Sequence, residues 1–231
     1  MIKPLIWKEW HELRWKMAFG CLIVGAFVLT GLKSRIFPDI AINIFSIVGS
    51  SLLMPLFIAM GLVAEERSNG SLYALFALPV RIKLLYVIKM ILGAVVVLSP
   101  ILVSLILSLL MAGGREESIS DVIKWHVMGA HFSIVMFIVT VVSGMKFSSE
   151  AKVALTGIAW VGFWVLCVII EVQMFFRYGS ESWTMIITPW GFFELAGSGG
   201  FLPVFLFHFV LCAAFFLWGA RRFYQLAGRQ R

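Results

Sequence analysis

The segment EERSNGSLYALFALP, from Glu65 to Pro79, decides how this chain is interpreted. It opens with charged residues, continues through the turn-forming run Ser68 to Gly70, and ends at a proline. Ser71 is placed to cap a short helix that Pro79 would end. Segments apolar enough to cross a bilayer lie on both sides. The pattern therefore predicts a short helix on a water-facing loop between two membrane spans.

The loop helix has one compact apolar face, formed by Leu72, Leu75 and Phe76. An apolar face on a loop in water would be costly unless a groove received it. The face therefore predicts contact with a soluble partner. Three charged residues at the start of the loop are then expected to set the docking register, namely Glu65, Glu66 and Arg67.

Composition places the chain in a bilayer. Hydrophobic residues make up 61% of the 231 residues and charged residues 13%, and the mean hydropathy is +0.98. A soluble domain is nearer half apolar and a quarter charged. The sequence predicts an all-α integral membrane protein, with residues 1–231 forming one membrane domain. The net charge of +7 does not indicate nucleic-acid binding, because no basic stripe of the required kind is present.

The apolar runs predict six membrane-spanning helices. Each is close to the roughly 20 residues needed to cross about 30 Å of hydrocarbon. The predicted spans are residues 17–32, 40–64, 88–111, 127–145, 153–171 and 202–220. The third contains Ser99 and Pro100, where we expect a kink.

The basic residues give the orientation. With a cytoplasmic N-terminus, 14 of the 19 Lys and Arg residues lie on the inner side and 5 on the outer side. Basic residues gather on the cytoplasmic side of spans. We therefore expect a multi-pass membrane protein whose two termini and loop at 65–79 are cytoplasmic.

Two flanking regions are expected to lie at the membrane surface. Residues 1–16 form an amphipathic pattern whose tryptophans suit the headgroup region, which predicts a separate interfacial helix carrying Trp7, Trp10 and Trp15. Residues 173–201 lie outside the membrane in this topology, yet they are apolar and interrupted at Pro189 and Trp190. That pattern favours a re-entrant helical hairpin before the last span.

The loop resembles the corresponding loop of ABC-2 type exporter permeases. Their pattern is Glu-Arg, two variable residues, Gly-Thr-Leu, an apolar helix ending in Pro, and a later Lys. Here the matching residues are Glu66, Arg67, Gly70, Ser71, Leu72, Pro79 and Lys89. One departure is Ile82, which stands where that family has an Arg. The interfacial helix, six spans and re-entrant region resemble the family more loosely.

The resemblance implies a permease subunit that forms the substrate pathway as a homodimer or heterodimer in membrane lipid. A separate ATP-binding subunit would dock on the loop helix and would carry ATP and Mg²⁺. This chain has no phosphate-binding Gly-rich loop of its own, so we expect neither an enzyme nor a cofactor or metal on it. Mildly polar residues of the expected pathway are Asn43, Ser46, Ser50 and Thr156.

Two other classes of protein fit the sequence less well. An intramembrane protease is disfavoured because Glu65 and Glu66 are followed at once by Arg67, and Gly70 stands where such a motif requires Arg. No hydrolase or metalloprotease motif is present either. A membrane anchor or sensor that does not transport remains the alternative. The sequence gives no specific substrate.

Overall fold

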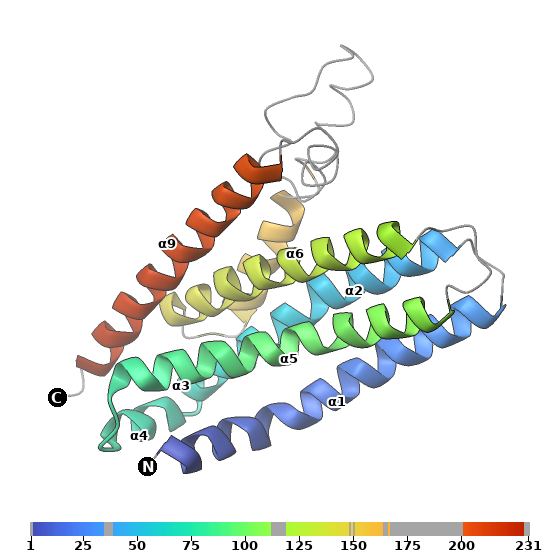
Figure 1. Ribbon diagram of the computed structural model, residues 1–231. Helices are drawn as coiled ribbons and strands as arrows, with labels where there is room; N and C mark the ends of the chain where they lie inside the picture. Colours follow the sequence, from blue (N-terminus) through green and yellow to red (C-terminus); the bar gives the residue numbers. More distant parts are fainter. Residues whose placement is uncertain are drawn as a thin grey trace.

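The computed structural model describes residues 2–34, 39–111, 119–147, 149, 151–163, 166 and 201–228. Every regular element within these ranges is a helix (Figure 1). The elements are α1 (Ile2–Ser34), α2 (Asp39–Ala59), the π-helical turn η1 (Met60–Glu65), α3 (Glu66–Ser68), α4 (Ser71–Ala77), α5 (Ile82–Met111), α6 (Ile119–Lys146) and α9 (Phe201–Gly228). A further apolar helix covers Ala151–Phe163.

Within the part of the chain that the structure describes, five helical segments are long and apolar enough to cross a membrane. They are Lys3–Gly31, Gly49–Ser68, Ile82–Met111, Val122–Lys146 and Leu206–Gly228. The prediction of a helical, multi-pass membrane protein is confirmed at this level. The predicted fifth span at 153–171 is described only in part, as the 151–163 helix, so the layout of six spans stays a prediction.

The prediction that residues 1–16 form a helix separate from the first span is wrong. α1 runs without interruption from Ile2 to Ser34, through the expected junction at Lys16 and Met17. No proline or cap interrupts the helix there, so hydrogen bonding continues. The buried residues Leu5, Glu9 and Leu13 recur every four residues and hold this half of α1 against the bundle.

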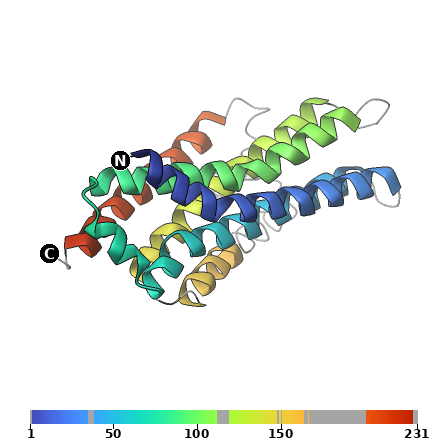
Figure 2. The ribbon, with the colours of Figure 1, turned by 90° about the horizontal axis from the view of Figure 1, so that it is seen from below.

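The helices pack as a bundle in which α1 lies along α5 and α2 lies along α6 (Figures 1 and 2). α5 also packs on α2 and α6, and α9 packs mainly on α6. Both chain ends lie at the end of the bundle that carries α4 (Figure 1). α6 and α9 run in the same direction along the bundle, toward that end.

The main apolar core lies at the α4 end of the bundle. One buried cluster joins residues of α1, η1, α4, α5, α6 and α9, including Leu13, Leu62, Leu72, Val97 and Phe223. The residues that sequence reasoning placed on a loop in water are therefore part of the chain's own interior. The core fixes α4 in place, and with it the loop.

The proline within α5 is accommodated locally. α5 continues through Pro100 as one helix. Proline has no N–H, so the carbonyl of Val96, four residues earlier, loses its helical donor. The Ser99 hydroxyl donates to that carbonyl oxygen at 2.8 Å. Such a side-chain replacement is how membrane helices tolerate proline.

Candidate functional site

The loop that sequence reasoning singled out is a tight turn followed by a two-turn helix. Gly70 has φ +74°, in the left-handed region that favours glycine. It occupies the N-cap position of α4, and Ser71 is the first helical residue. The predicted capping role of Ser71 is therefore wrong. Its hydroxyl instead donates back to the carbonyl oxygen of Glu66 at 3.2 Å.

The apolar face of α4 points into the bundle, which corrects the expectation that it is exposed. Leu72 is fully buried, and Leu75 and Phe76 are also buried. The ring of Phe76 meets that of Phe223 edge to face, with centroids 5.1 Å apart. The groove that receives this face belongs to the chain itself, formed partly by α9. These residues are positioned to anchor the loop rather than to touch a partner directly.

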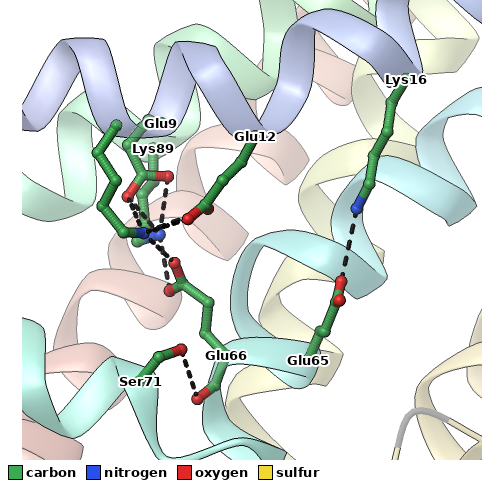
Figure 3. Close-up of polar contacts among 8 residues, drawn as sticks. Glu9, Glu12, Lys16, Glu65, Glu66, Ser71 and Lys89 are labelled. Carbon is green, nitrogen blue, oxygen red and sulfur yellow. Dashed lines mark hydrogen bonds and ion pairs between the residues drawn. The ribbon is translucent and has the colours of Figure 1, made fainter.

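A cluster of ion pairs joins the loop to α1 and α5 (Figure 3). Lys89 of α5 lies 2.8 Å from the nearer oxygen of Glu9 on α1 and 2.7 Å from Oε2 of Glu66 on α3. Lys8 of α1 lies 2.9 Å from Oε1 of Glu66 and 3.0 Å from Glu12. Glu66 is therefore held by ammonium groups from two different helices.

The centre of this charge cluster is closed to solvent. The side chains of Lys89 and Glu9 are 2% and 1% exposed, and that of Glu66 is 7% exposed. Isolated charges in such surroundings would be very unfavourable, because burial removes their hydration. Here each charge has an opposite partner within 3 Å, and removal of one partner would leave the others uncompensated. The charge cluster therefore joins three helical elements, and loss of any one of its charged side chains would destabilise their packing.

The flanking charged residues of the loop also bond within the chain. Arg67 donates from Nη1 to the carbonyl oxygen of Met145 at 3.0 Å, close to the C-terminus of α6. That carbonyl is among the last four of α6, which have no helical donor. Glu65 pairs with Lys16 of α1 at 3.5 Å, and both side chains are about half exposed. A role of these residues in docking register stays a prediction.

A cavity of about 290 Å³ lies between α1 and the η1–α3 segment. Its polar lining comes mainly from Glu9, Glu12, Lys16, Glu65 and Glu66. Gly61 forms part of the wall, and a side chain there would meet the ammonium group of Lys16. The cavity is therefore acidic and bordered by the ion pairs that hold the loop.

Three carboxylates of the charge cluster come close enough together to bind a cation. One oxygen from each of Glu9, Glu12 and Glu66 lies within 4.8 Å of the others. Lys8 has its ammonium group within 3.4 Å of all three residues. An internal cation therefore already supplies the charge that a metal ion would bring, and the cluster is best described as an ion-pair network.

The predicted interfacial tryptophans point outward to different degrees. Trp7 and Trp15 are 64% and 70% exposed, whereas Trp10 is only partly exposed. The guanidinium carbon of Arg14 lies 5.7 Å from the centroid of the Trp15 ring. This outward face suits the headgroup region even though the helix is continuous with the first span.

Two of the predicted pathway residues lie together on α2, and a third lies on a separate helix. Ser46 and Ser50 are buried inside the bundle, where Ser46 lies 3.1 Å from the Ser104 hydroxyl and Ser50 donates to the Ser46 carbonyl. Thr156 is partly exposed on the 151–163 helix and donates to the carbonyl of Lys152. The side chain of Asn43 lies outside the described residues, as do Pro189, Trp190 and the rest of the predicted re-entrant region up to residue 200.

Sequence reasoning missed the α1 half of the charge cluster. Neither Lys8 nor Glu9 was singled out as a partner of a buried charge. Lys89 was noted in the family pattern, without a predicted partner. A usable signal was present, since a Lys followed by 25 residues without a charge would need a buried partner. The identity of that partner depends on helix packing, which the sequence does not display.

Comparison with protein-family models and with curated proteins gives no match for this chain.

Proposed function

We propose that this chain is the permease subunit of an ATP-binding cassette exporter of the ABC-2 type. It would form the pathway with a second permease chain in the bacterial inner membrane and would couple to a separate ATPase subunit that holds ATP and Mg²⁺. The proposal is supported by the loop motif from Glu66 to Pro79 and by the five apolar helices. The basic residues support a cytoplasmic position for the loop.

The observation that carries the proposal is the attachment of the loop. Glu66 is bonded to Lys8 of α1 and to Lys89 of α5, while α4 is packed into the core. A force applied to the loop would therefore reach two long helices without being absorbed by a flexible connection. Such a rigid attachment is what a lever between a soluble motor and a membrane pathway requires.

The burial of the apolar face of α4 means that the proposed docking surface is the outer, exposed side of the loop. Leu72, Leu75 and Phe76 face inward, so an ATPase would contact the exposed residues. These are Ser68, Asn69, Gly70, Ser71, Ala74, Ala77, Leu78 and Pro79. The small side chains on this side would allow a partner's groove to approach the helix backbone closely.

The topology expected for this family is supported by the direction of the helices. α6 and α9 run the same way along the bundle, so the chain must return between residues 147 and 200. The apolar 151–163 helix begins that stretch. A sixth span there would place both termini on the loop side, in agreement with the distribution of basic residues.

The proposal is tested by enlarging the outer side of α4. Ala74→Trp and Ala77→Trp change exposed positions, so the permease should still fold and insert, but the ATPase encoded beside it should no longer co-purify. Ile123→Trp, an exposed position at the opposite end of the bundle, is the matched control. Full retention of the ATPase by both α4 variants, with unchanged transport, would contradict the coupling role.

A further inference from the structure

Arg14 of α1 is a basic side chain without an acidic partner. Two neighbouring basic residues of the same helix, Lys8 and Lys16, pair with carboxylates of the loop. Among the residues that the structure describes, none accepts a hydrogen bond or forms an ion pair with the Arg14 guanidinium, and its Nε is covered by other atoms. The guanidinium lies over the ring of Trp15, 5.7 Å from the centroid. Arg14 therefore carries a positive charge that the described part of the chain does not neutralise.

The level of Arg14 in the bundle follows from the register of α1 against α5. Two contacts set this register, those of Glu9 with Lys89 and of Gly20 with Pro100. Both join a residue of α1 to the residue of α5 that is 80 positions later. Arg14 is therefore level with Ala94, within the run of α5 from residue 90 to 111 that has no charged residue. Such a run suits hydrocarbon, where an unpaired charge is costly.

The direction of the helix turns the Arg14 side chain back toward the membrane surface. Side chains of a helix lean toward its N-terminus, and the N-terminus of α1 lies at the loop end of the bundle (Figure 1). A long basic side chain near the end of a span extends its charged group to the headgroups while its methylene groups stay beside apolar surface. The anions at that level are the phosphates of the lipid.

The flank of α1 that carries Arg14 faces an exposed apolar row of α5. Cys21 lies seven residues after Arg14, on the same flank, and its Sγ is 3.6 Å from the Ser99 hydroxyl of α5. The residues of α5 that share the row of Ser99 and are exposed are Ile91, Val95, Leu102 and Ile106. The row therefore offers an acyl chain an apolar surface that begins beside the guanidinium.

We propose that Arg14 binds the phosphate of one anionic phospholipid in the leaflet on the loop side, with an acyl chain along the exposed row of α5. The planar guanidinium presents paired N–H donors that match two phosphate oxygens. Phosphatidylcholine is a weaker ligand, because its own quaternary ammonium group already compensates its phosphate. The inference concerns the chain in lipid and does not depend on the proposed ATPase, so the two proposals can fail separately.

The test measures lipid binding by the detergent-solubilised, full-length chain with native mass spectrometry. Phosphatidylglycerol and phosphatidylcholine with the same acyl chains are titrated separately. The wild type should bind its first phosphatidylglycerol about fivefold more tightly than phosphatidylcholine, the effect of one basic residue on an anionic lipid. Arg14→Gln should remove this preference. Arg81→Gln, which changes an exposed arginine in the loop before α5, is the matched control and should keep it.

Two further measurements separate the lipid site from other roles of Arg14. Without added lipid, Arg14→Gln should have the melting temperature of Arg81→Gln, because no bond within the described chain is lost. Soluble glycerol phosphate in large excess should not displace the lipid, since the acyl chain contributes to binding. The proposal is overturned if the wild type has no preference, if Arg14→Gln keeps it or if Arg81→Gln also loses it. A lower melting temperature of Arg14→Gln would overturn it by showing a structural role, and displacement by glycerol phosphate by showing a site for free phosphate.

Discussion

Replacement of Lys89 by methionine should destabilise the protein strongly. The substitution keeps side-chain length and removes the ammonium group that is 2.8 Å from Glu9 and 2.7 Å from Glu66. The charge cluster holds three carboxylates, Glu9, Glu12 and Glu66, and two ammonium groups, Lys8 and Lys89, so its net charge changes from −1 to −2. The carboxylates that lose this ammonium partner, Glu9 and Glu66, are buried.

The magnitude follows from the burial of the partners. Removing one member of a buried ion pair costs about 3–5 kcal/mol, because the remaining charge is left without compensation. At about 2–4 °C for each kcal/mol in a chain of this size, the apparent melting temperature should fall by roughly 6–20 °C. Tryptophan fluorescence of the detergent-solubilised protein measures this transition.

Two variants separate the charge effect from other causes. Lys83→Met makes the same change at an exposed position of the same helix and should alter the melting temperature little. The double variant Glu9→Gln, Lys89→Met returns the net charge of the cluster to −1 and should recover more than half of the loss. The account of the charge cluster is wrong if Lys89→Met has the same melting temperature as Lys83→Met. It is also wrong if the double variant has a lower melting temperature than Lys89→Met alone.

Three further changes probe the loop and its contacts, all measured by the same thermal transition. Leu72→Ala should cost about 2–5 kcal/mol because it opens a cavity in the core, whereas Ala74→Ser on the exposed side of α4 should be nearly neutral. Gly70→Ala forces a side chain into the left-handed region and should cost about 1–2 kcal/mol; Gly49→Ala, in a helix with open space around it, should not destabilise. Tyr86→Phe removes a hydroxyl bonded to an α9 carbonyl at 3.0 Å and should cost about 0.5–1.5 kcal/mol.

Sequence reasoning found the loop but misjudged its orientation. The turn at Gly70 and the helix ending before Pro79 were predictable, because turn chemistry is local. The same apolar residues, Leu72 and Phe76, would suit either an external groove or an internal one. Periodicity shows that a face is apolar but not what covers it. The packing of α9 against α4 decided between the two.

A related limit applies to the start of the chain. Residues 2–16 are helical as predicted, but periodicity cannot distinguish a surface helix from the extension of a span. The buried contacts of Leu5, Glu9 and Leu13 belong to a continuous α1. The pairing of Glu9 with Lys89, 80 residues apart, has no local signature at all.

The sequence by itself determined that this protein lies in lipid and that it is helical. Long apolar runs must be helical in lipid, because only a helix satisfies its own backbone within a single segment. Tertiary structure alone decided which charges meet and which side of α4 remains outside. Those outcomes depend on residues far apart in the chain, whose buried ion pairs are favourable only once α1, α3 and α5 lie together.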